Sequence, residues 1–93
     1  DTIALSEKFS DPSSATKLIQ ESLDHFHAIE VSQGQKDYMK TILLAGQLDD
    51  QYWTDAWNDY KADPTNTTKK NVVEGRLKLL YKYIFNLAEY QLS

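Results

Sequence analysis

The sequence predicts an all-α fold of about four helices, a small helical bundle-like domain with a long C-terminal helix. Two observations lead to this fold class. Apolar residues recur at three- and four-residue spacing in four segments, which is typical of helices that bury one face. No segment alternates apolar and polar residues as a half-buried strand does. The chain has 93 residues, so we expect residues 1–93 to form a single domain, because domains commonly contain ~100–200 residues.

The N-terminal part of the chain predicts a lead-in segment followed by a helix. Residues 1–10 show no sustained period, and we expect a loop or a short helix there. The next segment has apolar residues at helical spacing over residues 13–27. Asp11-Pro12 indicates its start, because Asp caps free N–H groups and Pro fits the first helical turn.

The middle of the chain predicts two further helices. One covers residues 33–45, with Gly46 as its C-terminal stop. The next follows Asp49-Asp50, whose carboxylates suit a helix N-terminus, and it ends before Pro64. Pro64 and the short polar residues after it are typical of a loop.

The last helix, over residues 68–92, has the most regular apolar stripe of the chain. This stripe comprises Val73, Leu77, Leu80, Tyr81, Ile84, Phe85, Ala88 and Leu92. Gly75 costs about 1 kcal/mol relative to Ala inside a helix, so we expect it to mark a close approach of another helix. The stripe is wide, and exposure of Tyr81 or Phe85 would make the helix an interface as well as a core element.

Composition excludes several classes of function. The formal net charge is -4 with mixed signs, and a chain without a basic stripe is not expected to bind nucleic acid. No apolar run approaches the ~20 residues that a membrane-spanning helix needs. The absence of cysteine excludes disulfides and thiolate sites but does not distinguish cytoplasm from periplasm.

The third helix combines aromatic and acidic residues, and two interpretations of it stay open. Trp53, Trp57 and Tyr60 lie at helical spacing, which favours a shared core face. Aromatic rings beside Asp55 and Asp59 are also typical of sugar- or cation-binding surfaces. The candidate binding surface of the chain comprises Trp53, Trp57, Tyr60, Tyr81 and Phe85.

No motif assigns a catalytic residue, a cofactor site or a metal site. The aspartates of the third helix do not follow the calcium-loop pattern. His25 and His27 are two residues apart and point in different directions on a helix, so we expect them at the surface near a helix end. The glycines are too dispersed to hold a phosphate, and no serine lies in a hydrolase elbow. Arg76 lies among apolar positions, where an exposed Arg is more common than a buried anchor.

The second half of the chain resembles a known bacterial family. The residues that carry the resemblance are Tyr52-Trp53-Thr54-Asp55-Ala56-Trp57, Asp63-Pro64, Arg76-Leu77, Leu80-Tyr81-Lys82-Tyr83-Ile84 and Ala88-Glu89-Tyr90-Gln91-Leu92-Ser93. Over residues 47–93 they resemble the C-terminal end of the family catalogued as domain of unknown function 1800, in its Bacteroidetes-type members. The resemblance implies a helical C-terminal module of a longer, often exported protein without an established activity. The absence of a start Met before Asp1 fits such a fragment or a processed product.

Our leading hypothesis for function is a non-enzymatic helical interaction module of an exported bacterial envelope or secreted protein. Its partner would be another protein or the remainder of a longer chain, in the periplasm, at the outer membrane or outside the cell. Three alternatives stay open. They are a carbohydrate- or polymer-binding module that uses Trp53 and Trp57, an immunity-like helical bundle that neutralises a toxin, and the C-terminal fragment of an enzyme whose active site lies elsewhere. A cytoplasmic location is a further alternative.

Overall fold

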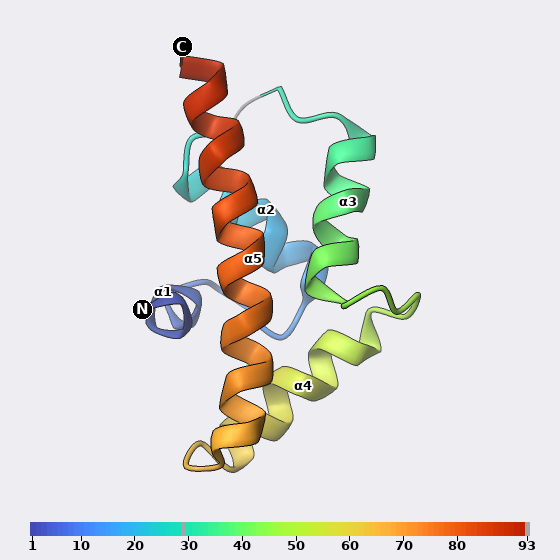
Figure 1. Ribbon diagram of the computed structural model, residues 1–93, viewed down its shortest axis with the longest axis vertical. Helices are drawn as coiled ribbons and strands as arrows, with labels where there is room; N and C mark the ends of the chain where they lie inside the picture. The colour runs from blue at the N-terminus through green and yellow to red at the C-terminus, as the bar shows by residue number, and fades with distance from the viewer. Residues whose placement is uncertain (29, 93) are drawn as a thin grey trace.

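The computed structural model describes residues 1–28 and 30–92, with side chains up to Tyr90, and these residues confirm the all-α class. Five helices follow one another, and the described residues contain no strand (Figure 1). They are α1 (Thr2–Glu7), α2 (Ala15–His25), α3 (Gln33–Leu43), α4 (Gln51–Ala62) and α5 (Thr67–Leu92). The predicted lead-in therefore holds a short helix, and the four longer helices were all predicted.

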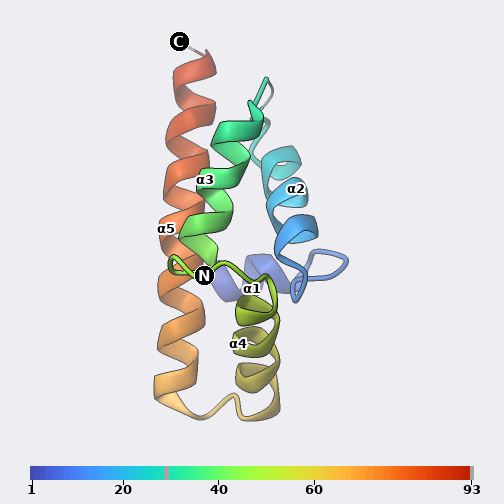
Figure 2. The ribbon, with the colours of Figure 1, turned by 90° about the vertical axis from the view of Figure 1, so that its right-hand side faces the viewer.

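Helix α5 extends along the whole length of the molecule and contacts each of the other four helices. Figures 1 and 2 show α2 and α3 beside its C-terminal half and α4 beside its N-terminal half. The loop after α4 reverses the chain, so α4 and α5 run in opposite directions (Figure 2). The fold thus has one long helix at one face and four shorter helices packed on it.

The core lies along one face of α5. Val73, Leu77, Leu80 and Ile84 have 0% of their surface exposed, and each buried aliphatic side chain of this size contributes roughly 1.5–3 kcal/mol. The other helices supply fully buried partners, which are Leu18, Met39, Leu43 and Trp53. The predicted stripe of α5 is therefore buried at these positions. Leu92, which was also assigned to it, lies outside the described side chains.

The start of α2 differs from the prediction at Asp11-Pro12. The helix begins at Ala15, and the N-cap is Ser14, whose side chain accepts from the Lys17 backbone N–H at 3.3 Å. The residues before it are held outside the helix by α4, because the Pro12 carbonyl accepts from Trp53 Nε1 at 2.7 Å. A tertiary hydrogen bond therefore overrides a local start signal.

Two helices end earlier than predicted because the chain turns into a left-handed conformation. Helix α2 ends at His25, and His27 has a φ of 58°. Helix α3 ends at Leu43, and Ala45 has a φ of 53°, directly before Gly46 at 81°. The Gly46 N–H donates to the Thr41 carbonyl at 3.0 Å, which closes the last turn of α3.

Local side chains cap the starts of the three later helices. Ser32 and Gln35 form a reciprocal capping box at the start of α3. At α4 the capping carboxylate is Asp49, which accepts from the Gln51 N–H at 2.9 Å, whereas the Asp50 side chain makes no cap bond. Asn66 accepts from the Lys69 N–H at 3.1 Å at the start of α5.

Gly75 does not mark a close helix contact, contrary to the prediction. A Cβ atom placed on Gly75 would meet no heavy atom within 4 Å outside its own helix. The position is open, so packing does not require glycine there.

Buried hydroxyl groups attach α1 to α5. Ser6 and Ser22 are both 0% exposed, and the Tyr81 hydroxyl hydrogen-bonds with Ser6. Burial of Tyr81 raises the pKa of its phenol above 10.0, although hydrogen bonds from Ser6 and Ser22 oppose the shift. This network orients α1 across the core face of α5.

Candidate binding groove between α3 and α5

The two tryptophans of the candidate surface are core residues. Trp53 is 0% and Trp57 5% exposed, and their ring centroids lie 6.0 Å apart. A sugar platform requires at least one exposed ring face, which neither residue offers. Both tryptophans therefore lie in the core, as the favoured interpretation of this helix expected, and not on a binding surface.

The three other candidate residues have different environments. Tyr60 is half-buried against Trp57, with ring centroids 6.1 Å apart. Tyr81 is 6% exposed, so it belongs to the core and not to a surface. Phe85 is 49% exposed and contacts Phe26 edge-on. Of these three residues, only Phe85 is an α5 stripe residue that reaches the surface, as expected if the stripe is wider than the core.

A hollow lies elsewhere on the surface, between α3 and α5. It has a volume of about 450 Å³. Tyr38 and Ile42 of α3 line one side together with Ala45, which follows that helix, and α5 lines the other side with Arg76, Leu79, Tyr83 and Asn86. The lining residues named on each side are three or four positions apart, so two adjacent faces form one continuous groove. We call this the α3–α5 groove.

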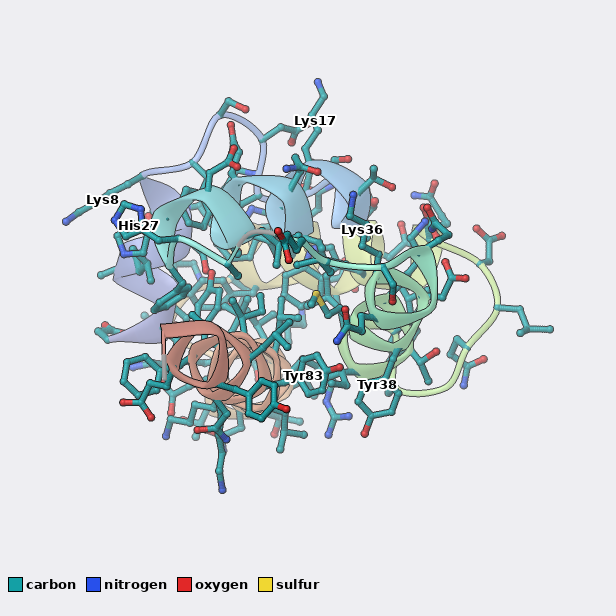
Figure 3. The ribbon with its side chains drawn as sticks, turned by 90° about the horizontal axis from the view of Figure 1, so that it is seen from above. Lys8, Lys17, His27, Lys36, Tyr38 and Tyr83 are labelled. Atoms are coloured by element: carbon teal, nitrogen blue, oxygen red, sulfur yellow. The ribbon has the colours of Figure 1, made fainter. Side chains whose placement is uncertain are left out.

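Two tyrosines stand at the wall of the α3–α5 groove. Tyr38 on α3 and Tyr83 on α5 have ring centroids 5.1 Å apart, and Figure 3 shows them side by side between the two helices. Tyr38 is 54% and Leu79 49% exposed. The groove therefore presents apolar and aromatic surface to solvent on a rigid helical frame.

A second, smaller hollow of about 260 Å³ lies between α4 and α5. It is lined by Tyr52, Asp55, Ala56, Asp59, Thr68, Lys69 and Val72. Val72 is 41% exposed. Because Val72, Arg76, Leu79 and Tyr83 follow one another at spacings of four, three and four along α5, the two hollows share one side of that helix.

The two hollows differ in charge. The α3–α5 groove contains the basic residues Arg76 and Lys82 and no acidic residue. The α4–α5 hollow contains Asp55 and Asp59 with one lysine. None of these four residues takes part in the Lys40–Asp50, Lys61–Glu7, Lys69–Asp63 or Lys78–Glu74 ion pairs. Arg76 is half-buried at the groove wall, so it is neither fully exposed to solvent nor fully buried as an anchor.

The sequence does contain a signal for this groove, in addition to the apolar stripe that was predicted to form the core. Beside the buried stripe of α5, a second stripe of apolar and aromatic residues recurs at heptad-like spacing and includes Val72, Leu79 and Tyr83. On α3, Tyr38 and Ile42 lie four residues apart within the helix predicted over residues 33–45, and Tyr38 is 54% exposed. Only the packing of α3 against α5 shows that these residues share one surface.

The described residues contain no arrangement typical of a metal centre. No group of three His, Cys, Asp or Glu side chains gathers there as potential metal ligands. His25 and His27 are exposed near the end of α2, as predicted. Among the same residues no helix is long and apolar enough to cross a bilayer.

Comparison with protein-family models, with curated proteins and with solved structures found no match. The resemblance of residues 47–93 to the C-terminal end of domain of unknown function 1800 therefore stays a prediction.

Proposed function

We propose that this chain is a non-enzymatic helical interaction module whose binding site is the α3–α5 groove. One observation carries the proposal: a continuous apolar and aromatic groove is exposed between two helices that the core already holds in place. The buried residues of α5 fix its axis, and the residues one position away on the same helix line the groove.

The geometry of the α3–α5 groove suits an amphipathic helix as its ligand. The lining residues recur at i, i+3, i+4 and i+7 along the chain on each side, so each side presents one face to the groove. Hydrophobic grooves between helices bind the apolar face of an amphipathic helix. Tyrosine and arginine dominate many protein interfaces, because they give large contact area with polar ends. The groove combines Tyr38, Tyr83 and Arg76 in this way.

The proposal can be tested with a displayed library of amphipathic helical peptides selected on the whole chain. Selected peptides should lose about tenfold or more in affinity on Leu79→Arg, which corresponds to about 1.4 kcal/mol. Leu48→Arg is the matched control, because Leu48 is 100% exposed and lies outside the groove. Far-ultraviolet circular dichroism would verify that both variants fold.

Two results would overturn this function. One is a selection that yields peptides binding equally well to wild type and to Leu79→Arg. The other is a substrate turned over by the chain and lost on Asp55→Asn or Asp59→Asn.

We further propose that the module belongs to a longer exported envelope or secreted protein of bacterial origin. The support is the resemblance carried by residues 47–93. An open reading frame that extends upstream and begins with a signal peptide is the expected result. A frame that starts at this chain without a signal peptide would refute the proposal.

A further inference from the structure

We infer that the occupant of the α3–α5 groove is a second copy of this chain, bound with its α5 antiparallel to the first. The inference rests on the proposed function, because it names the partner for the same groove. It follows from the spacing of one stripe on α5, from the charges on either side of it and from the area available.

The stripe that borders both hollows is symmetric along α5. Val72, Arg76, Leu79 and Tyr83 are separated by four, three and four residues, a spacing that reads the same from either end. A two-fold axis between Arg76 and Leu79 pairs Val72 of each copy with Tyr83 of the other. Isologous contacts of this kind are the usual form of homodimers, because one surface complements itself.

In this arrangement each copy closes the hollow of the other. Val72 lies in the α4–α5 hollow and is 41% exposed. Pairing with Tyr83 of the second copy places Val72 at the wall of the second copy's α3–α5 groove. Antiparallel heptad-like packing brings such residues together as knobs and holes.

Charge selects the antiparallel direction. Asp55 lines the same hollow as Val72, and Lys82 lines the same groove as Tyr83. When Val72 meets Tyr83 of the second copy, Asp55 approaches Lys82 of that copy. A parallel dimer would instead bring Lys82 to Lys82 and Asp55 to Asp55, which like-charge repulsion disfavours. The two Arg76 residues lie near each other at the two-fold axis in either arrangement, so they do not distinguish the two directions.

The available area matches that of a specific interface. Helix α5 has 26 residues, and at 1.5 Å per residue it is about 39 Å long. A strip of that length and two helices wide covers about 800 Å², which is the area per partner in standard protein interfaces. Helices α3 and α4 lie one beside the C-terminal half of α5 and the other beside its N-terminal half, so together they flank it along most of this length (Figures 1 and 2).

Sedimentation equilibrium of the whole chain at micromolar concentrations tests the inference. The expected mass is twice 10.7 kDa. Leu79→Arg should shift the population to monomer, whereas the matched control Leu48→Arg should stay dimeric. Asp55→Lys should weaken the dimer at least tenfold, and the double variant Asp55→Lys/Lys82→Asp should restore it.

Cysteine substitutions in this cysteine-free chain test the direction. A mixture of Val72→Cys and Tyr83→Cys chains should form a mixed disulfide under mild oxidation, because the two positions face each other. Val72→Cys alone should remain uncrosslinked. A disulfide dimer of Val72→Cys alone would show a parallel arrangement and overturn the inference.

A chain that is monomeric at all concentrations also overturns the inference. If that monomer still binds groove-directed helical peptides, the proposed function is retained and only the second copy is excluded. If it binds none of them, both proposals fail.

Discussion

Replacement of Tyr81 by Phe removes one hydroxyl group from the contact between α1, α2 and α5. The Tyr81 hydroxyl hydrogen-bonds with Ser6, and Ser6 and Ser22 are both fully buried. Each serine also donates to the carbonyl four residues earlier, Ser6 to Thr2 at 2.8 Å and Ser22 to Leu18 at 2.6 Å. Both serines therefore keep a partner in Tyr81→Phe.

The expected loss of stability follows from this geometry. An intramolecular hydrogen bond contributes a net ≈ 0.5–1.5 kcal/mol, and removal leaves no buried donor unpaired, so Tyr81→Phe should cost about 0.5–1.5 kcal/mol. For a domain of this size 1 kcal/mol corresponds to roughly 4–8 °C in Tm. Thermal or urea unfolding followed by circular dichroism measures it. The control is Tyr38→Phe, which removes a hydroxyl from a residue that is 54% exposed and should change stability by less than about 0.5 kcal/mol.

The same variant makes a prediction for pH. Burial raises the pKa of folded Tyr81 above 10.0, so the folded state holds this proton more tightly than the unfolded state. The resulting stability is complete below about pH 10 and is lost as the pH rises through the folded pKa. The advantage of wild type over Tyr81→Phe should therefore shrink at alkaline pH. Equal stability of Tyr81→Phe and wild type at neutral pH would refute the buried network, and an advantage that does not change above pH 10 would refute the raised pKa.

Three other substitutions have expected effects on the free energy of unfolding, all measurable by urea denaturation. Trp53→Phe should destabilise by about 2 kcal/mol or more, because it removes buried volume and the 2.7 Å bond to the Pro12 carbonyl; a change below that of surface variants would contradict this role. Gly75→Ala should stabilise by roughly 0.5–1 kcal/mol, since a Cβ there meets open space, and a loss of stability would indicate a contact that is absent from this fold. Ser32→Ala should cost about 1 kcal/mol, because it removes the side-chain acceptor of the capping box with Gln35. Ser32→Asp keeps an acceptor at the cap and should retain most of the wild-type stability.

The order and type of the helices could be read from the sequence because they depend on local spacing. Each long helix has apolar residues at three- and four-residue intervals, and the last one carries them over its whole length. The stop before Pro64 and the exposed positions of His25 and His27 follow from the same local rules. These features can be predicted without knowing which residues pack against each helix.

Helix boundaries were less predictable, because tertiary contacts compete with local signals. Asp11-Pro12 is a good start signal by itself, but its carbonyl is used by Trp53 of α4. Ala45 has no local reason to adopt a left-handed φ, and Gly46 beside it was the more obvious stop. In both places the surrounding fold decides which residue ends or starts the helix.

The sequence by itself determined an all-α domain with its core along α5, because hydrophobic periodicity is a property of each segment alone. Only the tertiary structure decided which aromatic residues reach solvent. Trp53 and Trp57, the most conspicuous candidates, became core, while Tyr38 on α3 and Leu79 on α5 became neighbours in one groove. The physical reason is that a groove is made by two helices, and its residues are far apart in the chain until those helices pack.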